Sequence, residues 1–172
     1  LDAIKDNQNG LKFLSKERVW NELQKILLSK NPSRALSEMS KIGVLEKVLN
    51  DGGIKSIKNL ISIEQKMGIE PEAIRRLVAI TRNTEITSLN LSRKEVKKFS
   101  LLKSLLEKNF DPAELVYQFN KEIAQSVLAI STFNQGEKLK LSDVKKIEKA
   151  CLYPCPISGA HLSKYMSGAD VG

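Results

Sequence analysis

The sequence from Leu14 to Leu28, LSKERVWNELQKILL, decides the fold class of this chain. Its apolar side chains are spaced so that they fall on one face of an α-helix. These side chains are Val19, Trp20, Leu23, Ile26 and Leu27. Ser15 has the hydroxyl that helix N-caps use, and Arg18 and Glu22 can pair across one turn of the outer face. The stretch therefore predicts an amphipathic helix that buries one apolar face.

The rest of the chain carries helix start and stop signals, and strand-type alternation is nearly absent. The start signals are Asn31-Pro32, Glu70-Pro71, the capping box Ser92 to Glu95, and Asp111-Pro112, and the stop signals include Gly43 and Gly68. We expect the helix that starts at Asp111 to run to about Ser131, with Phe119 on its inner face. The sequence thus predicts an all-α array of about eight or nine short helices with no significant sheet.

Helical periodicity also predicts which side chains are buried and where the chain divides. In the helix after Pro71 it turns Ile74, Leu77 and Val78 inward, and it leaves three arginines clustered off that face: Arg75, Arg76 and Arg82. In the helix after Ser92 it predicts four inward side chains: Val96, Phe99, Leu102 and Leu106. Residues 83–91 are the longest connection, so we expect them to separate residues 1–82 from residues 92–172.

The composition restricts the classes of function. The 172 residues carry 28 Lys and Arg against 20 Asp and Glu, a net charge of +8 that favours a polyanionic partner. Cys151 and Cys155 are too few for a disulfide scaffold, and with His161 as the single histidine they do not suggest a metal site. No signal peptide or membrane-spanning apolar run is visible, which predicts a cytoplasmic protein with free thiols.

A second motif, YPCPISGAHL, lies between Tyr153 and Leu162 and is followed by Gly168 and Gly172. Together with the first motif, in this order, it resembles the neck, body and early tail of bacterial class II CCA-adding tRNA nucleotidyltransferases and their poly(A) polymerase relatives. The pattern departs from that family at His161, where an aspartate is usual. The resemblance covers residues from about 14 to the end and implies an all-helical fragment.

The resemblance also implies where chemistry would lie. In that family, paired carboxylates after a Gly-Ser in an upstream catalytic head hold Mg²⁺ for transfer from ATP or CTP. This chain has no such pair and no phosphate-cradling glycine loop, so we expect no catalytic residue, no metal site and no cofactor within it. Glu17 and Arg18 would lie near the nucleotide pocket of the head, although an exposed ion pair at a helix start explains them more simply.

Two basic clusters are the better candidates for a binding site. The residues that we predict to contact RNA are Arg93, Lys94, Lys97, Lys98, Lys103, Lys138, Lys140 and Lys145. Lysines on helices suit contacts with phosphates that follow shape rather than base sequence, although a solvated helix face has the same composition. The resemblance implies tRNA or another structured RNA as partner, together with the parent's own N-terminal head. The alternative is a helical protein–protein interaction module, including a homodimer, that binds no RNA.

Overall fold

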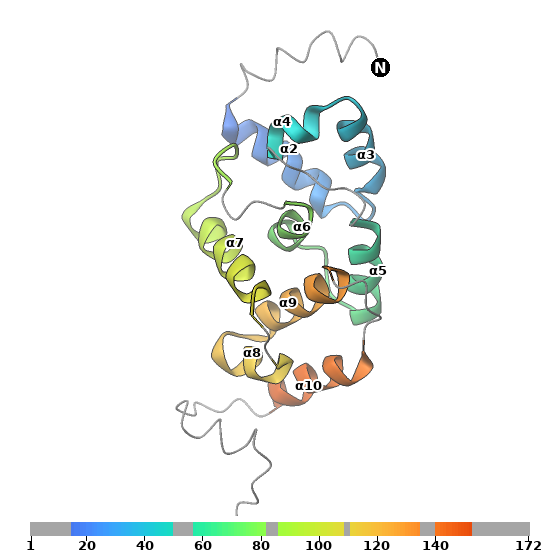
Figure 1. The fold of residues 1–172 in the computed structure, drawn as a ribbon, viewed down its shortest axis with the longest axis vertical. Coiled ribbons are helices and arrows are strands. Elements are labelled where there is room, and N and C mark those ends of the chain that lie inside the picture. The colour runs from blue at the N-terminus through green and yellow to red at the C-terminus, as the bar shows by residue number, and fades with distance from the viewer. Residues whose placement is uncertain (1–14, 50–56, 82–85, 109–110, 135–139, 153–172) are drawn as a thin grey trace, which may run out of the picture.

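The computed structural model describes residues 15–49, 57–81, 86–108, 111–134 and 140–152. These ranges hold nine α-helices and no strand, which confirms the predicted all-α class (Figure 1). In chain order they are α2 (Lys16–Leu28), α3 (Ser33–Lys41), α4 (Val44–Leu49), α5 (Ile57–Met67), α6 (Ala73–Ile80), α7 (Arg93–Leu106), α8 (Pro112–Gln118), α9 (Lys121–Asn134) and α10 (Leu141–Leu152). The second sequence motif, Arg82 and Lys138 lie outside the described residues.

Helix α2 forms as its sequence predicts. The Ser15 hydroxyl accepts a hydrogen bond from the Arg18 backbone N–H at 3.2 Å, so this serine is the N-cap. Trp20, Leu23 and Leu27 are buried, and Val19 and Ile26 are partly buried against the same core. The expected pairing of Arg18 with Glu22 is wrong, because Glu22 pairs with Lys25 at 2.9 Å.

The predicted inner face of α7 is wrong at its two ends. Phe99 and Leu102 are buried as expected, but Val96 is 46% exposed and Leu105 is buried at 3%. Leu106 is partly buried. Helix α7 packs against α6 and α9, and its contact with the core is made from Phe99 onward, while its start is largely exposed.

The long helix expected after Asp111 is two helices. Asp111 caps α8 as predicted, and its side chain accepts from the Ala113 backbone N–H at 2.8 Å. Phe119 then leaves the helical conformation, with φ −125° and ψ −84°, and its side chain is 37% exposed rather than buried. The Asn120 side chain accepts from the Ile123 N–H at 2.9 Å, so an asparagine that was expected inside one helix caps the next.

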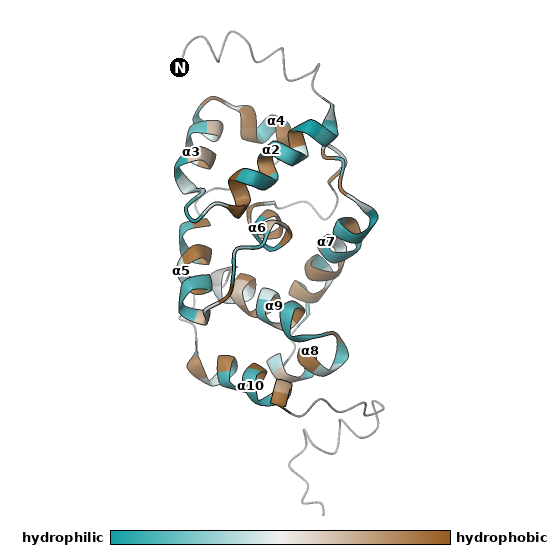
Figure 2. Ribbon diagram, turned by 180° about the vertical axis from the view of Figure 1, so that it is seen from behind, coloured by the Kyte–Doolittle hydropathy of each residue, from teal (hydrophilic) through white to brown (hydrophobic). Residues whose placement is uncertain are grey.

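Helix α9 lies at the centre of the lower part of the array. It contacts α5, α6, α7, α8 and α10, and Figure 2 shows it between α5 and α7. Ala124, Ala129 and Ile130 are completely buried in it. Because α9 is enclosed by helices on several sides, its apolar residues extend well beyond one stripe. In the described part of the chain, no helix has the length and hydropathy that crossing a membrane requires.

The expectation that Arg75 and Arg76 lie off the buried face is wrong. Their exposed fractions are 3% and 1%, and both pair with Glu64 of α5, which is 2% exposed. Arg75 Nε donates to Glu64 Oε1 at 2.7 Å, and Arg76 donates from Nε and Nη2 to Glu64 Oε2 at 2.9 and 2.7 Å. Helix α6 is buried on nearly every side, so its arginines need an internal counter-ion.

Arg76 also joins α6 to the end of α2. Its Nη1 donates to the backbone carbonyl of Leu27 and, at 2.7 Å, to that of Ser29. These oxygens belong to the last turn and C-cap of α2, where carbonyls have no partner within the helix. Arg75 Nη2 similarly donates to the Glu70 carbonyl, just before α6. One buried network of three charged side chains therefore connects α2, α5 and α6.

Candidate nucleic-acid interface

The start of α7 is built by a reciprocal capping box. The Ser92 hydroxyl accepts from the Glu95 N–H at 3.3 Å, and Glu95 Oε2 accepts from the Ser92 N–H at 2.7 Å. These bonds satisfy donors that a helix N-terminus would otherwise leave unpaired. They hold the first turn of α7, which carries Arg93 and Lys94 of the predicted site.

Arg93, Lys94 and Lys97 are all exposed on this first stretch of α7. None of the ion pairs found between described residues involves any of the three. Lys97 lies one turn after Arg93 on the same side of the helix, and Lys108, just beyond the end of α7, is also exposed. The cationic row, which we define as Arg93, Lys94 and Lys97, is therefore open to an external anion.

Two other lysines of α7 that were predicted to contact RNA are bonded to other parts of the protein. Lys98 Nζ pairs with Glu72 at 3.2 Å and with Glu122, and its side chain is 19% exposed. It joins α7 to the N-cap of α6 and the first turn of α9. These bonds make Lys98 an anchor of α7, and its contact with RNA remains a prediction.

Lys103 is similarly turned toward the protein. Its ammonium donates to the Thr81 carbonyl and lies 5.7 Å from the centre of the Phe99 ring. Burial lowers the pKa of Lys103 below its ordinary value, and the nearby Glu107 carboxylate opposes that shift. Lys103 is thus turned toward the protein, whereas Lys98, one turn after Lys94 on the same side of the helix, borders the cationic row.

The second basic cluster lies on α10, at the far end of the molecule from α2 (Figure 1). Lys140 and Lys145 are exposed there. Lys146 pairs with Asp111 at 2.8 Å, which connects α10 to the start of α8. Burial acts to raise the pKa of Asp111, but hydrogen bonds from Lys146 and the Ala113 N–H hold it below its ordinary value. This cluster therefore combines outward lysines with one that stabilises the fold.

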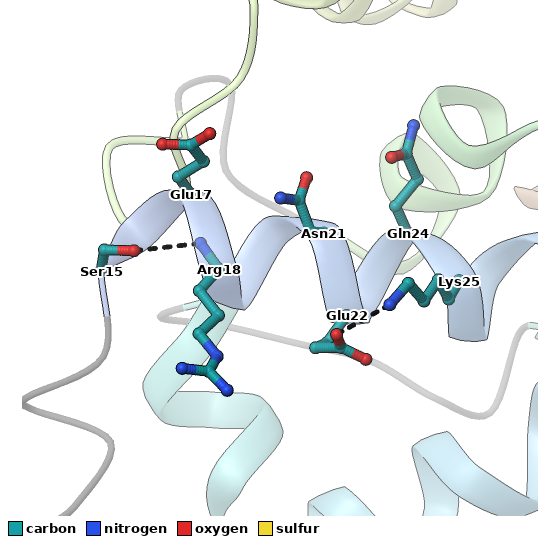
Figure 3. Close-up of a pocket in the computed structure, with 7 residues that line it drawn as sticks. All are labelled: Ser15, Glu17, Arg18, Asn21, Glu22, Gln24 and Lys25. Carbon is teal, nitrogen blue, oxygen red and sulfur yellow. Dashed lines mark hydrogen bonds and ion pairs between the residues drawn. The ribbon is translucent and has the colours of Figure 1, made fainter.

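The outer face of α2 forms an open polar hollow of about 450 Å³, shown in Figure 3. It is lined by Ser15, Glu17, Arg18, Asn21, Glu22, Gln24 and Lys25. It has two carboxylates and two cations, so its formal charge is zero, and every lining residue belongs to α2 or is its N-cap. Such a surface can offer polar contacts but does not enclose a substrate. Among the described residues, no three His, Cys, Asp or Glu side chains gather as metal ligands would.

Trp20 is buried at 3%, which confirms its interpretation as a core residue rather than an exposed base-stacking platform. Its indole Nε1 donates to Glu95 Oε1 at 3.2 Å, and the Gln24 amide approaches the same oxygen at 3.5 Å. Sequence reasoning missed this contact. The capping-box pattern identifies the bond of Glu95 to Ser92, but no local pattern indicates a partner 75 residues away.

The Lys98–Glu122 pair predicts a dependence of stability on pH. The hydrogen bond from Lys98 lowers the pKa of Glu122 below its ordinary value of 4.5, with partial burial opposing. A lowered folded pKa means that the pair stabilises the protein above the ordinary pKa and loses this effect as pH falls through the lowered value. Glu122→Gln should therefore reduce the melting temperature at pH 7 and make no difference at strongly acidic pH. The Glu122 side chain is 63% exposed, so the effect should be below about 1 kcal/mol. An equal difference at every pH would contradict this origin.

Two comparisons with known proteins bear on this surface. The family model described as "Probable RNA and SrmB- binding site of polymerase A" matches residues 1–52, which include α2, α3 and α4. CCA tRNA nucleotidyltransferase 1, mitochondrial, from Mus musculus is 25% identical over 190 aligned residues, which cover 100% of this chain and 43% of that relative. The chain therefore spans less than half the length of the relative. No solved structure matches the chain.

Both matches support the class of protein that the two sequence motifs suggested, the CCA-adding and poly(A) polymerase family. They do not single out its bacterial class II branch, since the relative is a mouse mitochondrial protein. The RNA-binding description falls on α2 to α4, whereas the cationic row lies on α7. The bond between Trp20 and Glu95 joins these two parts of the chain.

Proposed function

We propose that this chain is the RNA-binding helical body of a CCA-adding or poly(A)-adding enzyme, and that it binds tRNA or a similarly folded RNA through phosphates. The observation that carries the proposal is the cationic row Arg93, Lys94 and Lys97, exposed and without ion pairs to described residues. It is held beside α2, which lies in the segment matched to an RNA-binding site. Exposed cations on a rigid helix attract phosphates without reading bases.

Nucleotide transfer is proposed for the parent protein rather than for this chain. The CCA-adding activity is that of the mouse relative by its name, and this chain spans 43% of that relative. We place Mg²⁺, ATP or CTP and the catalytic carboxylates in the part of the parent that precedes the helical body. On this proposal the helical body contributes affinity and orientation of the RNA, while the head performs the chemistry.

Reversing the charge of the cationic row tests the RNA proposal. Lys94→Glu combined with Lys97→Glu should weaken binding of a purified tRNA about tenfold or more at low salt, since it replaces attraction to phosphates with repulsion. The slope of log affinity against log salt should fall by about 0.7–0.9 for each phosphate contact that is lost. Filter binding or fluorescence anisotropy at about 50 to 200 mM salt measures both quantities.

The matched control is Lys58→Glu combined with Lys66→Glu. Both lysines are exposed on α5, so this variant has the same net charge as the test variant. It should retain most of the affinity, because only the long-range field changes. Equal weakening by the two variants would show a non-specific charge effect, and no weakening by either would remove the cationic row from an RNA interface.

One observation favours the alternative of a protein–protein module. Leu141 and Leu152 of α10 are 69% and 76% exposed, the highest values among the large apolar side chains that the structure describes. They are eleven residues apart and so lie near the same side of the helix. Self-association through such residues would resist salt, whereas phosphate contacts weaken steeply with it. Sedimentation at high salt separates the two functions: a salt-resistant dimer that binds no tRNA supports the alternative.

A further inference from the structure

Glu95 makes hydrogen bonds on two sides, and only one of them serves its own helix. Oε2 accepts from the Ser92 N–H at 2.7 Å and completes the cap of α7. Oε1 accepts from the buried Trp20 indole at 3.2 Å, with the Gln24 amide at 3.5 Å, and both partners belong to α2. A single carboxylate therefore caps the start of α7 and connects α7 to α2.

A second bond joins the same two regions. Lys16 Nζ, in the first turn of α2, donates to the Thr87 carbonyl at 2.8 Å in the segment that leads into α7. Leu89, in the same segment, is buried at 5%. The chain that enters α7 is thus held along α2 before the helix starts, and Glu95 sets the position of its first turn.

The start of α7 carries the cationic row. Arg93 and Lys94 directly precede Glu95, and Lys97 follows it by two residues. Lys98 holds the next turn to α6 and α9 through Glu72 and Glu122. The row is therefore fixed from both sides: toward α2 by Glu95 and toward the body by Lys98. Contacts with several phosphates at once require such fixed spacing, because each mobile cation adds an ordering cost on binding.

We propose that Glu95 is a positioning residue of the RNA surface: through Trp20 it aligns the cationic row of α7 with α2, so that both helices engage one RNA. This inference rests on the proposed RNA-binding function and adds that the α2 segment and α7 act as one surface. Glu95 itself contacts no RNA on this proposal. Its carboxylate lies close to Arg93 and Lys94 in the sequence and repels phosphate, whereas the alignment that it provides favours phosphate binding.

The two effects of Glu95 on RNA affinity therefore predict opposite changes when it is replaced. Glu95→Ala removes a negative charge beside the cationic row, so electrostatics alone would tighten tRNA binding. Loss of alignment would weaken binding despite the more positive charge. Trp20→Phe removes the indole donor, leaves every charge in place and keeps the α7 cap. We expect both variants to bind tRNA about two- to tenfold more weakly than the wild type, the effect of one hydrogen bond.

Ser92→Ala is the matched control, because it removes the hydroxyl half of the cap and leaves the bond between Glu95 and Trp20 available. It should weaken tRNA binding less than Glu95→Ala does, because both variants lose half of the α7 cap but only Glu95→Ala also loses the bond to α2. All proteins are compared well below their melting temperatures, with helical content verified by circular dichroism. If Glu95→Ala does not fold, Trp20→Phe alone decides between the outcomes.

Binding by Trp20→Phe that equals the wild type, or tighter binding by Glu95→Ala, would overturn the positioning role. If, in addition, the double variant Lys94→Glu and Lys97→Glu binds tRNA more weakly than the wild type, the RNA-binding function stands and only the positioning role of Glu95 is excluded. If that charge-reversed variant binds normally, the RNA function itself fails. The two failures are therefore distinguishable in one set of titrations.

Discussion

Replacing Glu64 with alanine should lower the free energy of unfolding by about 3–5 kcal/mol, the range measured when one partner of a buried ion pair is removed. Glu64 is 2% exposed and accepts hydrogen bonds from both Arg75 and Arg76. Without it, two guanidinium groups stay buried in the core with no ion-pair partner among the described residues. Arginine does not lose its proton in proteins, so neither charge can be relieved by titration.

Urea denaturation followed by circular dichroism measures this loss, provided that the variant retains a folded baseline. The matched control is Glu22→Ala, which breaks the exposed pair with Lys25, where the side chains are 63% and 70% exposed. That change should cost at most about 1 kcal/mol. If Glu64→Ala cost no more than this control, the two arginines would have to reach solvent, and the buried network would not be the stabilising feature that we describe.

Replacing Arg76 with alanine should have a comparable effect, about 3–5 kcal/mol, but a different local signature. Glu64 keeps its bond to Arg75 in this variant. The carbonyls of Leu27 and Ser29 lose their donor, and a cavity opens where the arginine side chain was. The last turn of α2 should therefore fray before the rest of the molecule unfolds.

Native-state hydrogen exchange measures this fraying residue by residue. Protection should fall most at the backbone amides in the C-terminal turn of α2, and those at the centre of α9 should follow global stability. Arg34→Ala, at an exposed position on α3, is the control and should leave protection in α2 unchanged. A uniform loss throughout the molecule would show that Arg76 supports the core without a special role at the end of α2.

Part of this fold was predictable from the sequence and part was not. Helix starts depend on residues three or four positions apart, so the caps at Ser15, Ser92 and Asp111 were all identified from the sequence. The break between α8 and α9 was missed, because Asn120 can either continue a helix or cap one, and the neighbouring helices decide which.

The candidate site divides in a similar way. The sequence located the positive charge at the start of α7, since composition and spacing are local properties. It did not separate Lys94 and Lys97, which are exposed, from Lys98 and Lys103, which bond to other parts of the chain. The distinction depends on carboxylates and carbonyls of α6, α9 and the residue after α6, and no periodicity along α7 encodes them.

By itself, then, the sequence determined the helical class, most helix starts and the positive surface, because each follows from neighbours within one or two turns. Only the tertiary structure decided which charged side chains are buried in ion pairs and which are exposed. Arg75 and Arg76 read as solvent-facing on their own helix, yet both are buried, since α5 supplies Glu64 from eleven and twelve residues upstream. Glu95 reads as a cap and also holds Trp20, 75 residues away. Whether a charged side chain stabilises the fold or is free to bind a ligand depends on how far it is buried and on which partners other helices bring to it. Both depend on how the helices pack.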